Sequence, residues 1–188
     1  MDIDTLNQIK NNATLLHDNQ RIESALSCLV EKLTLDYANK NPIFLVVMNG
    51  GLIFAGQLLS RLKFPAQIDY CHATRYRGNT SGGEIGWKVE PHMDLAGRHV
   101  VILDDILDEG HTLKAIIEHC RSRKAQSVKT LVLIEKIHDR KASPGMRPDY
   151  CELETPDKYV FGYGMDYNHY WRNSDEIYIF NPERNDTE

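Results

Sequence analysis

Residues Val100 to Leu113 read VVILDDILDEGHTL, and this stretch decides the fold. Its first four residues are apolar and form the short run typical of a strand buried on both faces, which Asp104 and Asp105 are expected to end. After Gly110, apolar side chains recur at helical spacing, at Leu113, Ile116, Ile117 and Cys120. The stretch is therefore predicted to be a strand, a tight loop and a helix.

This arrangement suits a phosphorylated sugar. Backbone N–H groups of a glycine-containing loop that opens a helix point outward, where they and the helix dipole attract a phosphate. Asp104 and Asp105 would accept hydrogen bonds from vicinal hydroxyls or hold water on Mg²⁺. The same residues could instead cap a helix and make a turn, and residue types alone leave both interpretations open.

The order of residue types in this stretch is more specific than a glycine-rich loop. Four apolar residues, two acids, two apolar residues, Asp, any residue, Gly, any residue and Thr resemble the 5-phosphoribosyl-1-pyrophosphate (PRPP) signature of the type I phosphoribosyltransferases. The resemblance implies an α/β fold with a central, mostly parallel sheet, helices on both faces and a small hood. It also implies that a set of residues binds PRPP, namely Asp104, Asp105, Asp108, Glu109, Gly110, His111 and Thr112.

A second strand, loop and helix lie nearer the N-terminus. A helical period from Asp18 to Tyr37 is followed by the apolar run Ile43 to Met48, by Asn49, Gly50 and Gly51, and by a helical pattern over Leu52 to Leu62. By resemblance, the loop Met48, Asn49, Gly50 and Gly51 binds pyrophosphate, although the family often has Lys or Arg where this chain has Asn49. A plain turn with flexible glycines is the alternative.

A glycine-rich stretch follows a further predicted strand, Ala66 to Ala73. Thr74 to Glu90 contains four glycines among polar residues, which predicts a mobile loop. Closure of such a loop would exclude water from a reacting sugar. The family has a lid here, commonly with a Ser-Tyr pair, and the pair in this chain is Arg75 and Tyr76.

The C-terminal third carries the features that concern the base. The apolar strand predicted over Val128 to Ile134 ends at Glu135 and Lys136, which would lie at the carboxyl edge of a parallel sheet. The sequence PDKYVFGYGMDYNHYWR, residues 156 to 172, resembles the purine-binding hood of hypoxanthine-guanine phosphoribosyltransferases, and Ile177 to Phe180 is predicted to be the last strand. The resemblance covers roughly Ile43 to Phe180.

This resemblance assigns roles to individual residues. Asp108 would be the general base at the purine N7 proton, and Lys136 would donate to a 6-oxo group, because an ammonium has no acceptor for a 6-amino group. Tyr159 would stack on the purine, although core packing is an equal alternative, and the Val160 backbone would meet the ring edge. The remaining roles are pyrophosphate binding by Arg140 and Arg172, Mg²⁺ binding by Asp104, Asp105 and Asp166, and a part for Asp166 in the purine site as well.

Glu109 departs from the family, whose members often have a hydroxyl residue at this position. An anion beside a phosphate is repelled, so we expect the Glu109 side chain to turn outward while its N–H still donates.

Composition limits the classes of partner. A chain of 188 residues fits one domain, with a core over about 40–150 and a hood built from the N-terminal segment and about 151–188. The net charge of −5 argues against nucleic acid or an anionic membrane as partner, and no apolar run approaches the roughly 20 residues of a membrane span. The four cysteines and eight histidines lack metal-ligand spacing. A cytoplasmic location is expected, and the family implies a homodimer or homotetramer.

The sequence thus predicts a Mg²⁺-dependent phosphoribosyltransferase of purine salvage, with PRPP and a 6-oxopurine as substrates. A PRPP-binding regulatory protein without turnover is the competing class, and Asp108, Lys136 and Asp166 argue against it, since a sensor would not need a base site. A xanthine-preferring enzyme remains an alternative, because sequence does not fix the groups around the purine 2-position. An adenine or pyrimidine enzyme is disfavoured by Lys136.

Overall fold

The computed structural model describes residues 1–75 and 85–182 of the chain. Its main sheet has six strands in the order β4-β3-β2-β5-β6-β7. Five of them run parallel, and only the edge strand β4 is antiparallel to its neighbour. The strands are β2 (Ile43–Val47), β3 (Gln67–Arg75), β4 (Ile85–Val89), β5 (His99–Leu107), β6 (Ser127–Lys136) and β7 (Leu153–Thr155).

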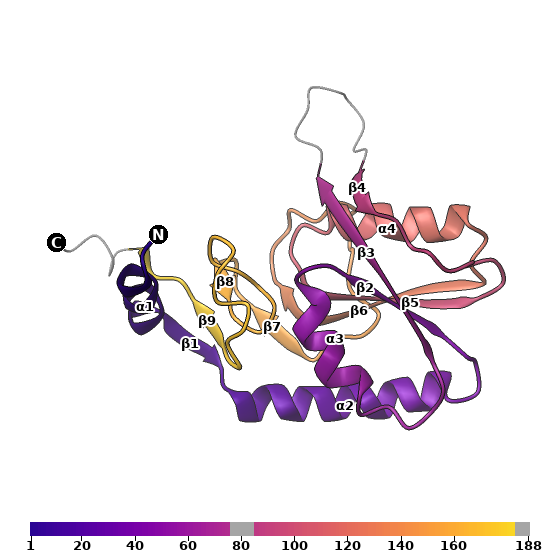
Figure 1. Ribbon diagram of the computed structural model, residues 1–188, viewed down its shortest axis with the longest axis horizontal. Helices are drawn as coiled ribbons and strands as arrows, with labels where there is room; N and C mark the ends of the chain where they lie inside the picture. The colour runs from indigo at the N-terminus through magenta and orange to yellow at the C-terminus, as the bar shows by residue number, and fades with distance from the viewer. Residues whose placement is uncertain (76–84, 183–188) are drawn as a thin grey trace.

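Helices cover both faces of this sheet (Figure 1). Successive side chains of each central strand point to opposite faces, so each strand packs against helices on both sides. Phe44 and Val46 of β2 pack with helices α2 (Asn19–Tyr37) and α3 (Gly51–Leu59). Ile43 and Leu45 of the same strand pack on the other face with α4 (His111–Ser122). Strands buried on both faces must be apolar throughout, which explains the runs at Ile43 and at Val100.

A second, three-stranded sheet joins the two ends of the described chain and forms the hood (Figure 1). It orders β1 (Thr14–His17), β9 (Ile177–Ile179) and β8 (Val160–Phe161) in antiparallel pairs, and α1 (Ile3–Asn12) precedes it. The Trp171 indole N–H donates to the Leu6 carbonyl at 3.0 Å, and the Lys10 ammonium lies 5.2 Å from the centres of the Trp171 and Tyr178 rings. These contacts hold α1 against the hood.

The predicted fold class is confirmed, and two local predictions are wrong. Strand β5 does not end at Asp104 but continues to Leu107, because it stays paired with β6 as far as Leu107 and Glu135. Thr74 to Glu90 is not a loop throughout, since β3 reaches Arg75 and β4 pairs with it. The Trp87 side chain of β4 packs against His119 with ring centres 4.8 Å apart, which gives this short strand an anchor on α4.

All four cysteines are free thiols. Burial raises the pKa of Cys71 to about 12 and those of Cys120 and Cys151 to about 11, so these thiols stay protonated at neutral pH. In the part of the chain that the structure describes, no helix combines the length and the hydropathy needed to cross a membrane.

Packing of α2 on the sheet is predicted to carry much of the stability. Leu29 is fully buried, so Leu29→Ala should lower the free energy of unfolding by about 2–5 kcal/mol. Leu35 lies on the same helix but is 87% exposed, and Leu35→Ala should change stability by less than about 0.5 kcal/mol. Denaturant unfolding of both variants checks the difference, and equal losses would contradict this account of the core.

Candidate functional site

The ends of β5 and β6 define the centre of the site. Because the two strands are parallel and in register up to Leu107 and Glu135, the residues that follow this pair lie side by side at the edge of the sheet. These residues are Asp108 and Lys136, and the Lys136 ammonium lies 2.5 Å from Asp108 Oδ2. Ligands of open α/β sheets bind at this edge, beyond the carboxyl ends of the strands.

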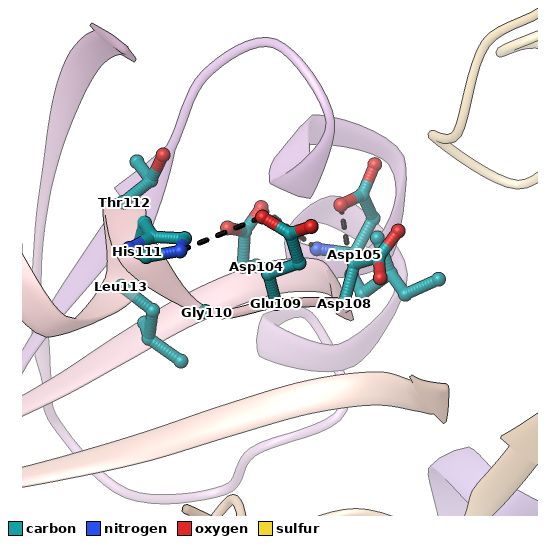
Figure 2. A pocket seen from close by; sticks show the side chains of 9 residues that line it. Asp104, Asp105, Asp108, Glu109, Gly110, His111, Thr112 and Leu113 are labelled. Atoms are coloured by element: carbon teal, nitrogen blue, oxygen red, sulfur yellow. Dashed lines mark hydrogen bonds and ion pairs between the residues drawn. The ribbon is translucent and has the colours of Figure 1, made fainter. Parts of the chain in front are cut away.

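The loop from β5 to α4 encloses a pocket of about 280 Å³ (Figure 2). Gly110, at φ +84°, adopts a left-handed conformation that opens α4, whose first-turn N–H groups have no partner within the helix. All seven residues predicted to bind PRPP line this pocket, together with Ile106 and Leu113. The pocket therefore combines carboxylates at one end with a helix N-terminus at the other.

Glu109 differs from the expectation that it turns outward. Its carboxylate lines the pocket and lies 3.5 Å from His111 Nε2 (Figure 2). Both side chains are half-exposed, so the nearby imidazole offers the carboxylate a partner inside the loop. A phosphate in this pocket would have to displace the Glu109 side chain or bind beside it.

Asp104 and Asp105 occupy the inner end of the pocket. Burial raises the pKa of both carboxyls, and repulsion from Asp105 raises that of Asp104 further, while Arg172 opposes both shifts. Among the described residues, no group of three or more His, Cys, Asp or Glu side chains is placed to hold a metal ion. Mg²⁺ commonly binds one or two carboxylates together with substrate phosphates, and two adjacent acids that line one pocket fit that mode.

The loop Met48 to Gly51 passes directly beside these acids. A Cβ atom at Gly50 would lie 2.1 Å from Asp105 Oδ2, and a Cβ at Gly164 of the hood would lie 2.2 Å from the Gly50 carbonyl oxygen. Asn49 is exposed, and the peptide bond between Met48 and Asn49 is cis. Two glycines thus allow the predicted pyrophosphate loop, the acid pair and the hood to meet at van der Waals distance.

A second pocket of about 320 Å³ adjoins the first and shares Asp105, Ile106 and Asp108 with it. All four residues predicted to bind the purine line it, namely Lys136, Tyr159, Val160 and Asp166, and so does Met165. The Tyr159 hydroxyl donates to the Asp166 carbonyl at 2.9 Å, and its ring meets Tyr167 and Phe180 edge-on. Tyr159 is half-exposed, so one ring face can receive a flat ligand.

The charge state of Asp108 follows from its neighbours. Partial burial alone would raise its pKa, but hydrogen bonds from Lys136 and His138 outweigh burial and lower the pKa below its usual value. Asp108 is therefore ionised at neutral pH and can accept a proton.

Arg172 and Arg140 each bind a carboxylate, and the two carboxylates belong to different residues. Arg172 Nη2 lies 2.7 Å from Asp166 Oδ1, and its Nη1 donates to the Gly164 carbonyl at 2.5 Å. Arg140 instead forms two hydrogen bonds with Asp157, at 2.5 and 2.8 Å, which hold the pKa of Asp157 at about 2. Either guanidinium would have to share or leave its present partner to bind pyrophosphate, and of the two Arg172 is the one whose charge acts on Asp104 and Asp105.

The predicted lid is only partly described. Arg75 ends β3, and Tyr76 lies outside the described residues. Their roles stay predictions.

Four residues at the site are not predicted from the sequence. Ile106 and Met165 line the base pocket, His138 contacts Asp108, and the Lys141 ammonium donates to the carbonyls of Leu107, Asp108 and Lys136. His138 lies two residues beyond the end of β6, and this position just past the carboxyl end of a parallel strand could have identified it as a candidate site residue. Nothing in the local pattern distinguishes Lys141 from a surface lysine.

Comparison with known proteins places this geometry in a family. The model of the phosphoribosyl transferase domain matches residues 12–168. The chain belongs to the phosphoribosyltransferase family. Its PRPP-signature loop and hood are therefore features of a phosphoribosyltransferase rather than chance likenesses.

Named phosphoribosyltransferases match most of the chain. A hypoxanthine-guanine phosphoribosyltransferase of Streptococcus pneumoniae is 34% identical over 170 residues, which are 90% of this chain and 93% of the relative. A hypoxanthine-guanine-xanthine phosphoribosyltransferase of Tritrichomonas foetus is 31% identical over 85% of this chain and 86% of the relative. A crystal structure of a Staphylococcus aureus hypoxanthine phosphoribosyltransferase superposes with a TM-score of 0.86 at 29% identity, covering 97% of each chain.

The close approach at Gly50 yields a paired test. Gly50→Ala should abolish PRPP binding, because the added methyl group would overlap the Asp105 carboxylate at 2.1 Å. In Gly56→Ala, on the adjoining helix α3, the methyl group meets nothing within 4 Å and should stabilise the helix by about 0.5–1 kcal/mol. Calorimetric titration with PRPP and thermal unfolding of both variants separate the two effects. Unchanged PRPP affinity in Gly50→Ala would exclude this loop from the site.

Proposed function

We propose that this phosphoribosyltransferase acts in purine salvage, transferring the phosphoribosyl group of PRPP to N9 of hypoxanthine or guanine to give IMP or GMP and pyrophosphate. The observation that carries the proposal is the Asp108 and Lys136 pair, which lines a pocket next to the phosphate-binding loop. The named activities of relatives at 31–34% identity support it.

In the proposed reaction, one pocket binds the phosphoribosyl group and the other binds the purine. The β5–α4 loop binds the 5′-phosphate through the N–H groups of the first turn of α4, and Asp104 and Asp105 bind the ribose hydroxyls. The purine lies against Tyr159, with its ring edge at the Val160 backbone. Asp108 takes the N7 proton as N9 bonds to C1 of the ribose, and the C1–O bond to pyrophosphate breaks.

The departing pyrophosphate develops negative charge. The backbone of Met48 to Gly51, which lies against Asp105, and the guanidinium of Arg172 would stabilise it. Mg²⁺ is the proposed cofactor, held by Asp104, Asp105 and Asp166 together with substrate oxygens, and it would neutralise the leaving group. Asp166 also accepts from the His169 N–H at 2.7 Å, which fixes its orientation.

Base selection depends on Lys136. An ammonium has three N–H donors, so it can donate to Asp108 and to a 6-oxo group at the same time. The N–H donors of a 6-amino group would face the N–H donors of Lys136, and this mismatch excludes adenine. A xanthine preference is the second candidate, favoured by the Tritrichomonas foetus relative, whose name includes xanthine.

We further propose a cytoplasmic homodimer or homotetramer. Ile68 and Tyr70 of β3, which pair with Phe44 and Val46 of β2, and Leu52 of α3 are all apolar and more than 40% exposed. An exposed apolar surface of this kind is typical of an interface between subunits.

The test measures pyrophosphate release from PRPP with hypoxanthine, guanine, xanthine and adenine offered separately. We expect turnover of 6-oxopurines and none of adenine. Lys136→Met should lower kcat/KM for hypoxanthine by about 10- to 100-fold, the usual effect of losing a charged hydrogen bond. Lys129→Met, which removes an exposed lysine of the same strand, should stay within about twofold of the wild type. Saturable PRPP binding without turnover of any base would instead support a regulatory protein.

A further inference from the structure

His138 makes two hydrogen bonds that fix where its proton lies. Its side chain is 4% exposed, and Nε2 lies 2.8 Å from Asp108 Oδ1. The backbone N–H of Arg140 donates to the other ring nitrogen, Nδ1, at 3.0 Å. A nitrogen that accepts a hydrogen bond carries no proton, so the proton is on Nε2 and is donated to Asp108. The imidazole that satisfies both contacts is neutral.

The two oxygens of Asp108 therefore face different partners. Oδ1 meets the buried His138, which is not among the residues that line the base pocket. Oδ2 meets Lys136, which does line that pocket. One oxygen is thus bound to a residue of the protein interior, and the other to a residue that lines the space in which a base would bind.

Hydrogen bonding also decides which oxygen can change its protonation state. If Oδ2 takes a proton, Oδ1 becomes a carbonyl oxygen and still accepts from His138, so that bond persists through the reaction. A neutral donor also holds the carboxylate without adding a second full positive charge beside Lys136. The Lys141 ammonium fixes the backbone instead, since it donates to the Asp108 carbonyl at 2.8 Å.

We propose that His138 is a positioning residue, which locks Oδ1 of Asp108 so that Oδ2 is the atom that takes the purine N7 proton. This inference rests on the proposed function. In the step, the N7–H bond breaks and the proton bonds to Oδ2, the N9 electron pair bonds to C1, and the C1–O electron pair leaves with pyrophosphate. His138 neither gives up nor gains a proton, and it touches no substrate.

Glutamine and methionine have nearly the same shape, and only glutamine carries an N–H donor at the reach of Nε2. We expect His138→Met to lower kcat by about 10- to 100-fold, the usual range for losing a group that orients another, with KM for PRPP and hypoxanthine within about threefold of wild type. His138→Gln should recover kcat to within about fivefold of wild type. Thermal unfolding of both variants shows whether they differ in stability.

Three results would overturn the role. They are an undiminished kcat in His138→Met, equal losses in both variants, and losses confined to KM. If His138→Met does not fold, ¹⁵N NMR of histidine-labelled wild-type protein decides, because a charged ring or a proton on Nδ1 contradicts the assignment. Absence of turnover in the wild type would refute the proposed function itself, whereas an active wild type with an equally active His138→Met refutes only the role of His138.

Discussion

The parallel pairing of β5 with β6 is the constraint on which the site depends. Register between the two strands holds as far as Leu107 and Glu135. It brings the Asp108 carboxylate and the Lys136 ammonium, which are 28 residues apart in sequence, to within 2.5 Å of each other. The loops that leave these strands then have fixed starting points. The β5 loop wraps the N-terminus of α4, and the segment after β6 returns over it, with the Ala142 N–H donating to the Glu109 carbonyl at 2.7 Å.

The hood completes the site from the other side. Gly164 lies against the Gly50 backbone and the Asp105 side chain, so the hood, the loop after β2 and the acid pair share one contact point. Arg172 reinforces this point by binding the Gly164 carbonyl and Asp166 together. Because the hood sheet pairs β1 with β9, segments from both ends of the described chain help to position the residues that line the second pocket.

Much of this arrangement could be predicted from the sequence, because it depends on local patterns. Buried parallel strands are apolar throughout, and a Gly that opens a helix after two acids is a strong local signal, so the strands around Ile43 and Val100 and both loops were predicted. The PRPP signature and the hood sequence also predict residues that bind PRPP and the purine, and the structure brings these residues into two adjoining pockets.

What sequence could not supply are contacts between distant segments. The end of β5 was placed too early because two acids interrupt the apolar run, whereas pairing with β6 carries the strand onward. The partner of Arg140 is Asp157, and the partner of Glu109 is His111. Lys141 binds three carbonyls, which come from β5, from the loop after it and from β6. Left-handed backbone at Trp171 has no signal in residue type either, because a bulky aromatic residue rarely adopts it.

A crystal structure of the protein with bound IMP tests the central claim most directly. The account predicts the purine 6-oxo oxygen within hydrogen-bond distance of Lys136 Nζ, N7 beside Asp108 Oδ2, and the 5′-phosphate on the N–H groups that open α4. A nucleotide with its base turned away from Lys136, or its phosphate outside the β5–α4 loop, would contradict the account.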